Sequence, residues 1–148
     1  MKKQSILAGG IVLLCMCLGC PNPDTNQQEE PKLSVNSTLV DFGDVDVGAQ
    51  QTRTIQIENT GNATLEISAM QMNGAGDFSL QAASNSLELY DGESRIITVM
   101  FSPATEGAAY ADLNINCNDP NQRVCKISLQ GNGIQTQTTE AEWIVGQW

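Results

Sequence analysis

The chain has 148 residues, of which 17 are acidic and seven basic, and its net charge is −10. Phosphate backbones repel so acidic a domain, and nucleic-acid binding is therefore disfavoured. The chain has no histidine, which excludes Ser–His–Asp, Cys–His and His-based zinc sites. Gly, Asn, Thr, Ser and Gln separate short apolar runs, a pattern that favours strands and turns over helices.

The first twenty residues have the order of a secretory signal. A basic start at Lys2-Lys3 is followed by an apolar run over residues 6–18, which is too short to span about 30 Å of hydrocarbon. Gly19 then precedes Cys20, and this order resembles a lipoprotein signal, although Cys17 takes the position where that pattern has Leu. The resemblance implies cleavage after residue 19 and lipid attachment at Cys20. The alternatives are an uncleaved signal-anchor and an ordinary cleaved signal.

The segment after Cys20 is polar and punctuated by proline. Such a composition cannot bury enough apolar surface to fold, so residues 20–31 are expected to form a disordered tether. Cleavage of the signal leaves five basic residues against 17 acidic ones, a net charge of −12. So acidic a chain does not adsorb to anionic lipid by charge, and the lipid itself is the expected membrane attachment.

From residue 32 to residue 134 the pattern has period two and is broken by turn residues about every 8–12 positions, which is typical of a β-sandwich. We expect an all-β domain of seven strands, the first of them split, and no long helix. The strand ranges are 33–35 with 39–42, 52–58, 64–72, 77–80, 87–90, 95–101, 110–117 and 124–130. The side chains expected to face the core are Ile55, Ile57, Leu65, Ile67, Ile97, Val99, Phe101, Ala111, Leu113, Ile115, Ile127 and Leu129.

Six short motifs follow one another along these strands. They are Val40-Asp41-Phe42-Gly43-Asp44-Val45, Ile57-Glu58-Asn59-Thr60-Gly61-Asn62, Leu65-Glu66-Ile67, Val99-Met100-Phe101-Ser102-Pro103, Leu113-Asn114-Ile115 and Leu129-Gln130-Gly131-Asn132-Gly133. Together they resemble the abnormal-spindle/Hydin (ASH) domain, which also occurs in bacterial choice-of-anchor D proteins and is related to the major sperm protein and PapD-like folds. The resemblance implies an immunoglobulin-like sandwich that works as a binding or scaffolding module.

Three of these motifs predict local structure. Phe42-Gly43-Asp44 is expected to bend the first strand between the two sheets. Phe101-Ser102-Pro103 ends a strand, because proline cannot donate to the ladder. Gly131-Asn132-Gly133 is expected to release the chain from the sandwich.

Cys117 and Cys125 lie on the last two predicted strands. The pairing that sets Leu113 against Leu129 also sets these two cysteines directly opposite each other. Opposed residues lie about 4.5–5.5 Å apart, within the range of a disulfide, so we expect a structural Cys117–Cys125 disulfide in an oxidising compartment. The alternatives are two core thiols or, less favoured without histidine, a metal pair.

Asp41, Asp44 and Asp46 raise the question of a calcium site, but no 12-residue acidic loop with a Gly turn is present. We expect a solvated acidic edge, no metal and no cofactor. At the other end of the chain, a polar linker leads to the apolar tail residues Trp143, Ile144, Val145 and Trp148. This tail packs on the sandwich, is disordered, or docks a partner.

The sequence shows no acid–base or nucleophile constellation. We expect a non-enzymatic, lipid-anchored protein of the cell envelope, on the outer membrane and facing the periplasm or the medium, with a protein partner and no small-molecule substrate. The alternative is an envelope chaperone that binds extended peptides by strand addition. A chaperone of that kind needs a basic anchor for a peptide carboxylate, and the basic residues form no close pair in the sequence; they are Lys32, Arg53, Arg95, Arg123 and Lys126.

Overall fold

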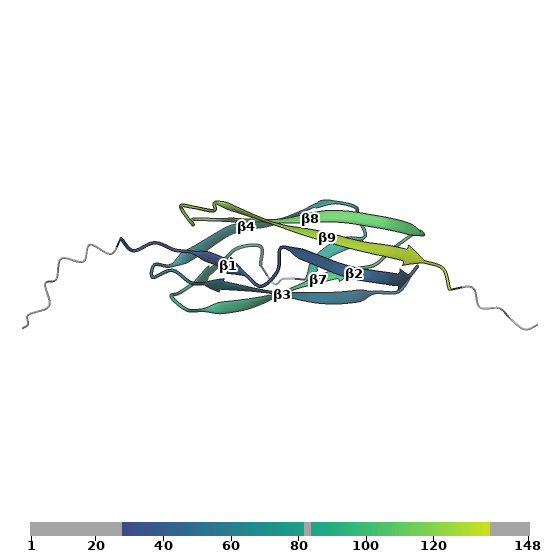
Figure 1. The fold of residues 1–148 in the computed structure, drawn as a ribbon, viewed down its shortest axis with the longest axis horizontal. Coiled ribbons are helices and arrows are strands. Elements are labelled where there is room, and N and C mark those ends of the chain that lie inside the picture. The colour runs from purple at the N-terminus through teal and green to yellow at the C-terminus, as the bar shows by residue number, and fades with distance from the viewer. Residues whose placement is uncertain (1–27, 82–83, 137–148) are drawn as a thin grey trace, which may run out of the picture.

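The computed structural model describes residues 28–81 and 84–136, which form two β-sheets packed face to face (Figure 1). This confirms the expected all-β, immunoglobulin-like sandwich. Over the described residues the chain forms no helix, and therefore none that is long and apolar enough to span a membrane.

The two sheets contain nine strands over these residues, which corrects the predicted count of seven. The strands are β1 (Leu33–Val35), β2 (Leu39–Asp46), β3 (Gln51–Asn59), β4 (Leu65–Gly74), β5 (Phe78–Gln81), β6 (Leu87–Leu89), β7 (Ser94–Phe101), β8 (Gly107–Cys117) and β9 (Val124–Ile134). One sheet has the order β1-β3-β7-β5 and the other β2-β9-β8-β4-β6. Each of the nine ranges given from the sequence corresponds to one of these strands, and the two parts of the split first strand lie in different sheets.

The first strand changes sheets between β1 and β2. β1 pairs antiparallel with β3, whereas β2 pairs parallel with β9 in the other sheet. The change takes place over residues 36–38, so the expectation that Phe42-Gly43-Asp44 makes this bend is wrong. Gly43 instead forms a bulge inside β2 with a φ of 68°, a conformation that glycine adopts without a Cβ penalty.

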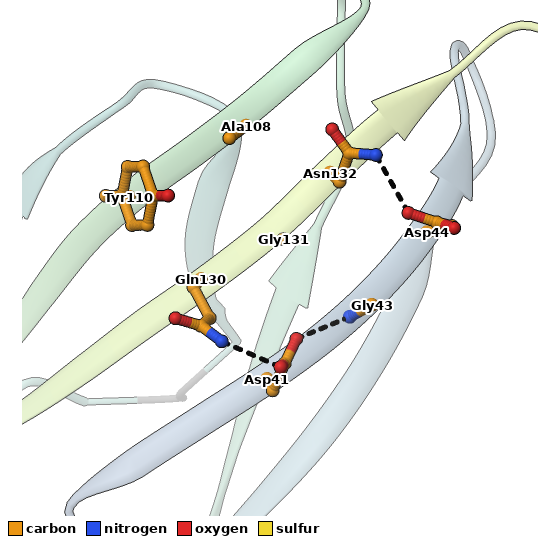
Figure 2. Close-up of a pocket in the computed structure, with 8 residues that line it drawn as sticks. All are labelled: Asp41, Gly43, Asp44, Ala108, Tyr110, Gln130, Gly131 and Asn132. Atoms are coloured by element: carbon orange, nitrogen blue, oxygen red, sulfur yellow. Dashed lines mark hydrogen bonds between the residues drawn. The ribbon is translucent and has the colours of Figure 1, made fainter.

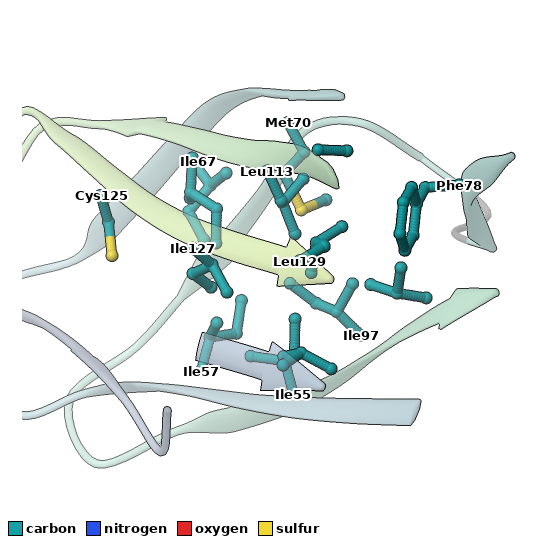
Figure 3. Close-up of a cluster of buried hydrophobic side chains, with 14 of the residues drawn as sticks. Ile55, Ile57, Ile67, Met70, Phe78, Ile97, Leu113, Cys125, Ile127 and Leu129 are labelled. Atoms are coloured by element: carbon teal, nitrogen blue, oxygen red, sulfur yellow. The ribbon is translucent and has the colours of Figure 1, made fainter. Parts of the chain in front are cut away.

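The core lies between the sheets and is built from alternate residues of each strand (Figure 3). All twelve side chains that the alternation predicted to face inward are buried. Period-two alternation locates them because successive strand residues point to opposite faces of a sheet.

The last strand is longer than predicted. β9 continues through Gly131-Asn132-Gly133 to Ile134, so these glycines do not release the chain. A Cβ at Gly131 would lie 2.6 Å from a ring carbon of Phe101. Phe101 stacks on Phe78 with ring centroids 4.6 Å apart, and Phe42 lies 5.6 Å from Phe101. Glycine at position 131 therefore makes room for an aromatic cluster between the sheets.

The chain enters the sandwich through a set of hydrogen bonds that we call the N-terminal clasp. The clasp consists of Asn59, Asn62 and Asp119, which hold residues 30–33. The Asn62 Oδ1 accepts from the Glu30 amide at 2.9 Å, and the Glu30 carbonyl accepts from the Asn62 amide at 3.1 Å. The clasp thus holds Glu30, which belongs to the range predicted as a tether.

Asn59 and Asp119 are the buried members of the clasp. Asn59 is 0% exposed, and its Oδ1 accepts from the amides of Lys32 and Gly61. Its Nδ2 donates to two backbone carbonyls, of Ala63 and Leu89. The side chain therefore connects the entering chain to the β3–β4 turn and to β6.

Asp119 is 2% exposed and belongs to the β8–β9 hairpin. Its Oδ2 accepts from the Leu33 amide at 2.9 Å. Its Oδ1 accepts from the amides of Asn121 at 2.8 Å and Gln122 at 3.2 Å. One carboxylate thus fixes both the hairpin turn and the start of β1.

Candidate binding surface

The outer face of the five-stranded sheet carries polar side chains on β2, β9 and β8. Because strand residues alternate between faces, these side chains are the neighbours of the core residues in the sequence. They form rows across the sheet, since Leu39 pairs with Ser128 and Asp41 pairs with Gln130. Gln130 in turn pairs with Tyr110 on β8. The face therefore displays carboxylates, carboxamides and one aromatic ring side by side.

Three aspartates of β2 accept hydrogen bonds from the β9 chain, and we call this set the carboxylate ladder. The Gln130 Nε2 donates to Asp41 at 2.7 Å, and the Asn132 Nδ2 donates to Asp44 at 2.8 Å (Figure 2). The Thr136 hydroxyl donates to Asp46 just past the end of β9. The bulge at Gly43 is needed for this arrangement, because residues three apart in a regular strand point to opposite faces.

Tyr110 is the large exposed group on this face, with 64% of its surface accessible. It lines a hollow of about 260 Å³ together with Asp41, Asp44 and Asn132, and a second hollow of about 200 Å³ together with Leu39. Figure 2 shows the ring over β8, beside the ladder. An amphipathic ring between two hollows is suited to contact a partner, since it offers both an apolar face and a hydroxyl.

Two carboxylates of this face, Asp41 and Asp112, are held in their charged form. The hydrogen bond from Gln130, followed by the Gly43 amide, lowers the pKa of Asp41 below its ordinary value. The hydrogen bond from Lys126 lowers the pKa of Asp112 in the same way, and the two groups are 2.9 Å apart. The face is therefore acidic, with the Lys126 charge already paired.

The aspartates of the acidic edge do not come together as a group of metal ligands within the described residues. No group of three or more carboxylate or thiol side chains there is arranged to hold a metal ion. Each of the three ladder aspartates instead accepts from a neutral donor of the β9 chain. The arrangement is that of a solvated strand edge with side-chain bridges.

The predicted alignment of the last hairpin is wrong by two residues. Leu113 pairs with Ile127, and Ile115 pairs with Cys125, so Cys117 lies diagonal to Cys125 instead of opposite it. Diagonal neighbours are about 7–8 Å apart, at or beyond the upper limit for a disulfide. Both cysteines are buried free thiols in the structure, and burial raises the pKa of each.

Several predicted functional residues lie outside the described residues. These are the lipidation site Cys20 and the tail residues Trp143, Ile144, Val145 and Trp148. The roles assigned to them stay predictions.

The alternation contained a signal for the clasp that the sequence analysis missed. Asn59 continues the inward series of Ile55 and Ile57, and Asp119 continues the inward series that includes Ile115 and Cys117. A polar residue at an inward position of a strand requires buried hydrogen-bond partners. This rule would have identified both residues as polar groups inside the sandwich.

Comparisons with known proteins place this fold. The chain is similar to a protein of unknown function from Porphyromonas gingivalis W83, with 21% identity and a TM-score of 0.62, over 74% of this chain and 50% of that one. It is also similar to the ASH/PapD-like domain 7 of human CEP192, with 12% identity and a TM-score of 0.55, over 82% and 99%. The periplasmic chaperone SfaE matches at 11% identity and a TM-score of 0.53, over 69% and 58%.

The chain thus spans about half the length of the P. gingivalis protein. Parts of secreted proteases and of a glycoside hydrolase share the fold as well. None of the curated proteins matches this chain. The family model for domain 4 of Cep192 matches residues 30–134. This range includes all nine strands of the described sandwich and begins at Glu30, the first residue that the clasp holds. The chain belongs to the Cep192 domain 4 family, whose relatives here are ASH/PapD-like immunoglobulin folds.

Proposed function

We propose that this chain is a non-enzymatic binding module of the cell envelope, anchored through lipid at Cys20. Its binding surface is the outer face of the five-stranded sheet around Tyr110. The partner is a protein, and no cofactor or small-molecule substrate takes part.

The observation that carries the proposal is a pair of exposed apolar groups, Tyr110 and Leu39, that lie beside the polar groups of the carboxylate ladder. Tyr110 is 64% exposed and Leu39 is 53% exposed, and both line the same hollow. Polar groups of the ladder surround them. An aromatic anchor within a polar rim is the usual composition of a protein interface.

The chaperone alternative has less support. Strand addition requires a free sheet edge, yet the edge strands β1, β5 and β6 have three, four and three residues, and the fourth, β2, is bulged at Gly43. Two of the five basic groups that could bind a peptide carboxylate form ion pairs with acidic side chains. Arg95 pairs with Glu93 at 3.1 Å, and Lys126 pairs with Asp112.

The lipid anchor rests on the sequence order of Lys2-Lys3, the apolar run and Gly19-Cys20. A Cys20→Ala chain expressed in a bacterial host should leave the membrane fraction and lose labelling by a clickable fatty acid. A variant that stays in membranes would overturn the anchor in favour of a signal-anchor.

The binding surface is tested separately with two tyrosines that are equally exposed. Tyr110 and Tyr90 are both 64% accessible, but only Tyr110 lies in the hollows of the five-stranded sheet. Pull-down from detergent-solubilised envelope should recover one stable partner with the natural chain and with Tyr90→Ser, and lose it with Tyr110→Ser. Recovery of many unfolded exported proteins would indicate a chaperone instead.

A further inference from the structure

The two ends of the described chain lie at opposite ends of the sandwich. Figure 1 shows β1 near one end of the long axis, with β2 and β9 both running toward the other end. β2 and β9 pair in parallel over six residue pairs, from Leu39 with Ser128 to Asp46 with Ile134. The second strand, β2, and the last strand, β9, are thus hydrogen-bonded to each other along the long axis of the domain.

This arrangement decides how a pull on the two chain ends would load the fold. Tension enters β2 from the N-terminal end and leaves β9 at its C-terminal end, so the two strands are pulled past each other. The backbone hydrogen bonds between β2 and β9 lie across the strands. A pull along the strand axis therefore loads all of them together. A pull that peels the strands apart from one end would instead break them one at a time.

Additional bonds reinforce this interface. Backbone bonds close both of its ends, since the Ser128 amide donates to Thr38 at 2.9 Å and the Val47 amide donates to Ile134 at 2.8 Å. The carboxylate ladder adds bridges between β2 and the β9 chain. The backbone pairing of β8 with β9 then connects β9 to the rest of the sheet over ten residue pairs.

The N-terminal clasp lies on the same path. Residues 30–33 are held by Asn59, Asn62 and Asp119 before the chain enters β1. β1 then pairs with β3 over three residue pairs. A pull on the N-terminal end therefore meets the clasp, then β1, and then the β2–β9 interface.

We propose that the domain is a mechanical link that carries tension between its N-terminal and C-terminal ends. Its resistance lies in the parallel β2–β9 interface and the carboxylate ladder. This role rests on the proposed lipid anchor for the identity of the load at the N-terminal end. The mechanical property itself belongs to the folded chain and can be measured without lipid.

The test compares two directions of pull by single-molecule force spectroscopy on the chain from Cys20 to Trp148. In the first, handles are attached at the two chain ends. In the second, one handle stays at residue 20 and the other is attached through Asn121→Cys, in the β8–β9 hairpin beside the clasp. Forced unfolding reports the height of the unfolding barrier, so simultaneous loading should require a higher unfolding force than sequential loading.

Matched variants test which hydrogen bonds resist forced unfolding. Gln130→Ala with Asn132→Ala removes two ladder bonds on the path, whereas Asn118→Ala removes two bonds between β4 and the end of β8, off the path. The double variant should lower the end-to-end unfolding force, and Asn118→Ala should leave it within error.

Two results would overturn the proposal. One is an equal unfolding force in the two directions of pull for the natural chain. The other is a loss of end-to-end force in Asn118→Ala as large as that in the double variant. Since neither measurement involves lipid or a partner, failure here would leave the proposed envelope role to its own tests.

Discussion

Two sets of polar side chains hold the terminal strands, and they differ in burial. The N-terminal clasp relies on Asn59 and Asp119, which are 0% and 2% exposed. The carboxylate ladder relies on Asp41, Asp44 and Asp46, which are exposed. Both sets satisfy backbone or side-chain groups by hydrogen bonds of similar length.

The difference separates equilibrium stability from directional strength. A buried donor or acceptor that loses its partner cannot form a hydrogen bond with water instead. Breaking the clasp therefore costs the desolvation free energy of each group left without a partner. An exposed carboxylate that loses a partner is hydrated at once. The clasp should therefore contribute more than the ladder to the free energy of unfolding, while the ladder should matter mainly when the β2–β9 interface is pulled.

The largest expected effect is that of Asn59→Ala. The substitution leaves the Lys32 and Gly61 amides and the carbonyls of Ala63 and Leu89 without this partner. The free energy of unfolding should fall by about 3 kcal/mol, measured by urea unfolding with an unchanged m-value.

Asn62→Ala is the matched control for this change. Asn62 also accepts from the entering chain, but its bond to Glu30 is exposed. Its loss should lower the free energy of unfolding by less than about 1 kcal/mol. Equal losses in the two variants would show that burial does not distinguish the buried Asn59 from Asn62, the exposed member of the clasp.

Asp119→Ala should rank second. It removes the acceptor for the Leu33 amide and for the two hairpin amides. We expect a loss of about 2 kcal/mol in the free energy of unfolding, less than for Asn59 because Asp119 makes three of these hydrogen bonds and Asn59 makes four. Asp91→Ala, in an exposed turn, serves as the control and should change stability little.

The sequence predicted inward apolar residues of β3, β4, β7, β8 and β9 but not the polar groups that are buried beside them. Alternation identifies a face, and Ile55, Ile57 and Asn59 share one face whatever their chemistry. The acceptors that make a buried Asn tolerable come from distant segments such as β6. Hydrogen bonds between segments this far apart cannot be inferred from spacing along one strand.

The alignment of residues between neighbouring strands could not be predicted from the sequence either. The apolar residues of β8 and β9 recur every second position, so a shift of two residues preserves the alternation and changes every partner. The Asp119 carboxylate sets the hairpin turn and hence the shift that is used. Similarly, the sequence Gly131-Asn132-Gly133 alone is typical of a chain that leaves the domain. The structure shows that Gly131 lacks a side chain because the Phe101 ring occupies the space where a Cβ would lie.

This alignment leads to a prediction for Cys117 and Cys125. As diagonal free thiols with a pKa raised by burial, they should resist maleimide in the native protein and both react on unfolding. Reductant should leave the urea midpoint unchanged, whereas loss of a disulfide in so short a loop would lower stability by about 2–3 kcal/mol. An intact mass lower by two hydrogens would restore the disulfide.

The smallest expected effect is that of Asp41→Asn on the exposed ladder. The hydrogen bond from Gln130 lowers the folded-state pKa of Asp41, so its contribution to stability is present above the ordinary Asp pKa of about 3.9 and is lost as pH falls through the lower folded value. At neutral pH the variant should be slightly less stable than the natural chain, and the two unfolding curves should converge in acid. The same substitution in a Gln130→Leu background should have a smaller effect, because the main cause of the lowered pKa is gone. A difference that persists unchanged as the pH falls far below the ordinary Asp pKa would mean that the carboxylate charge is not what the ladder uses.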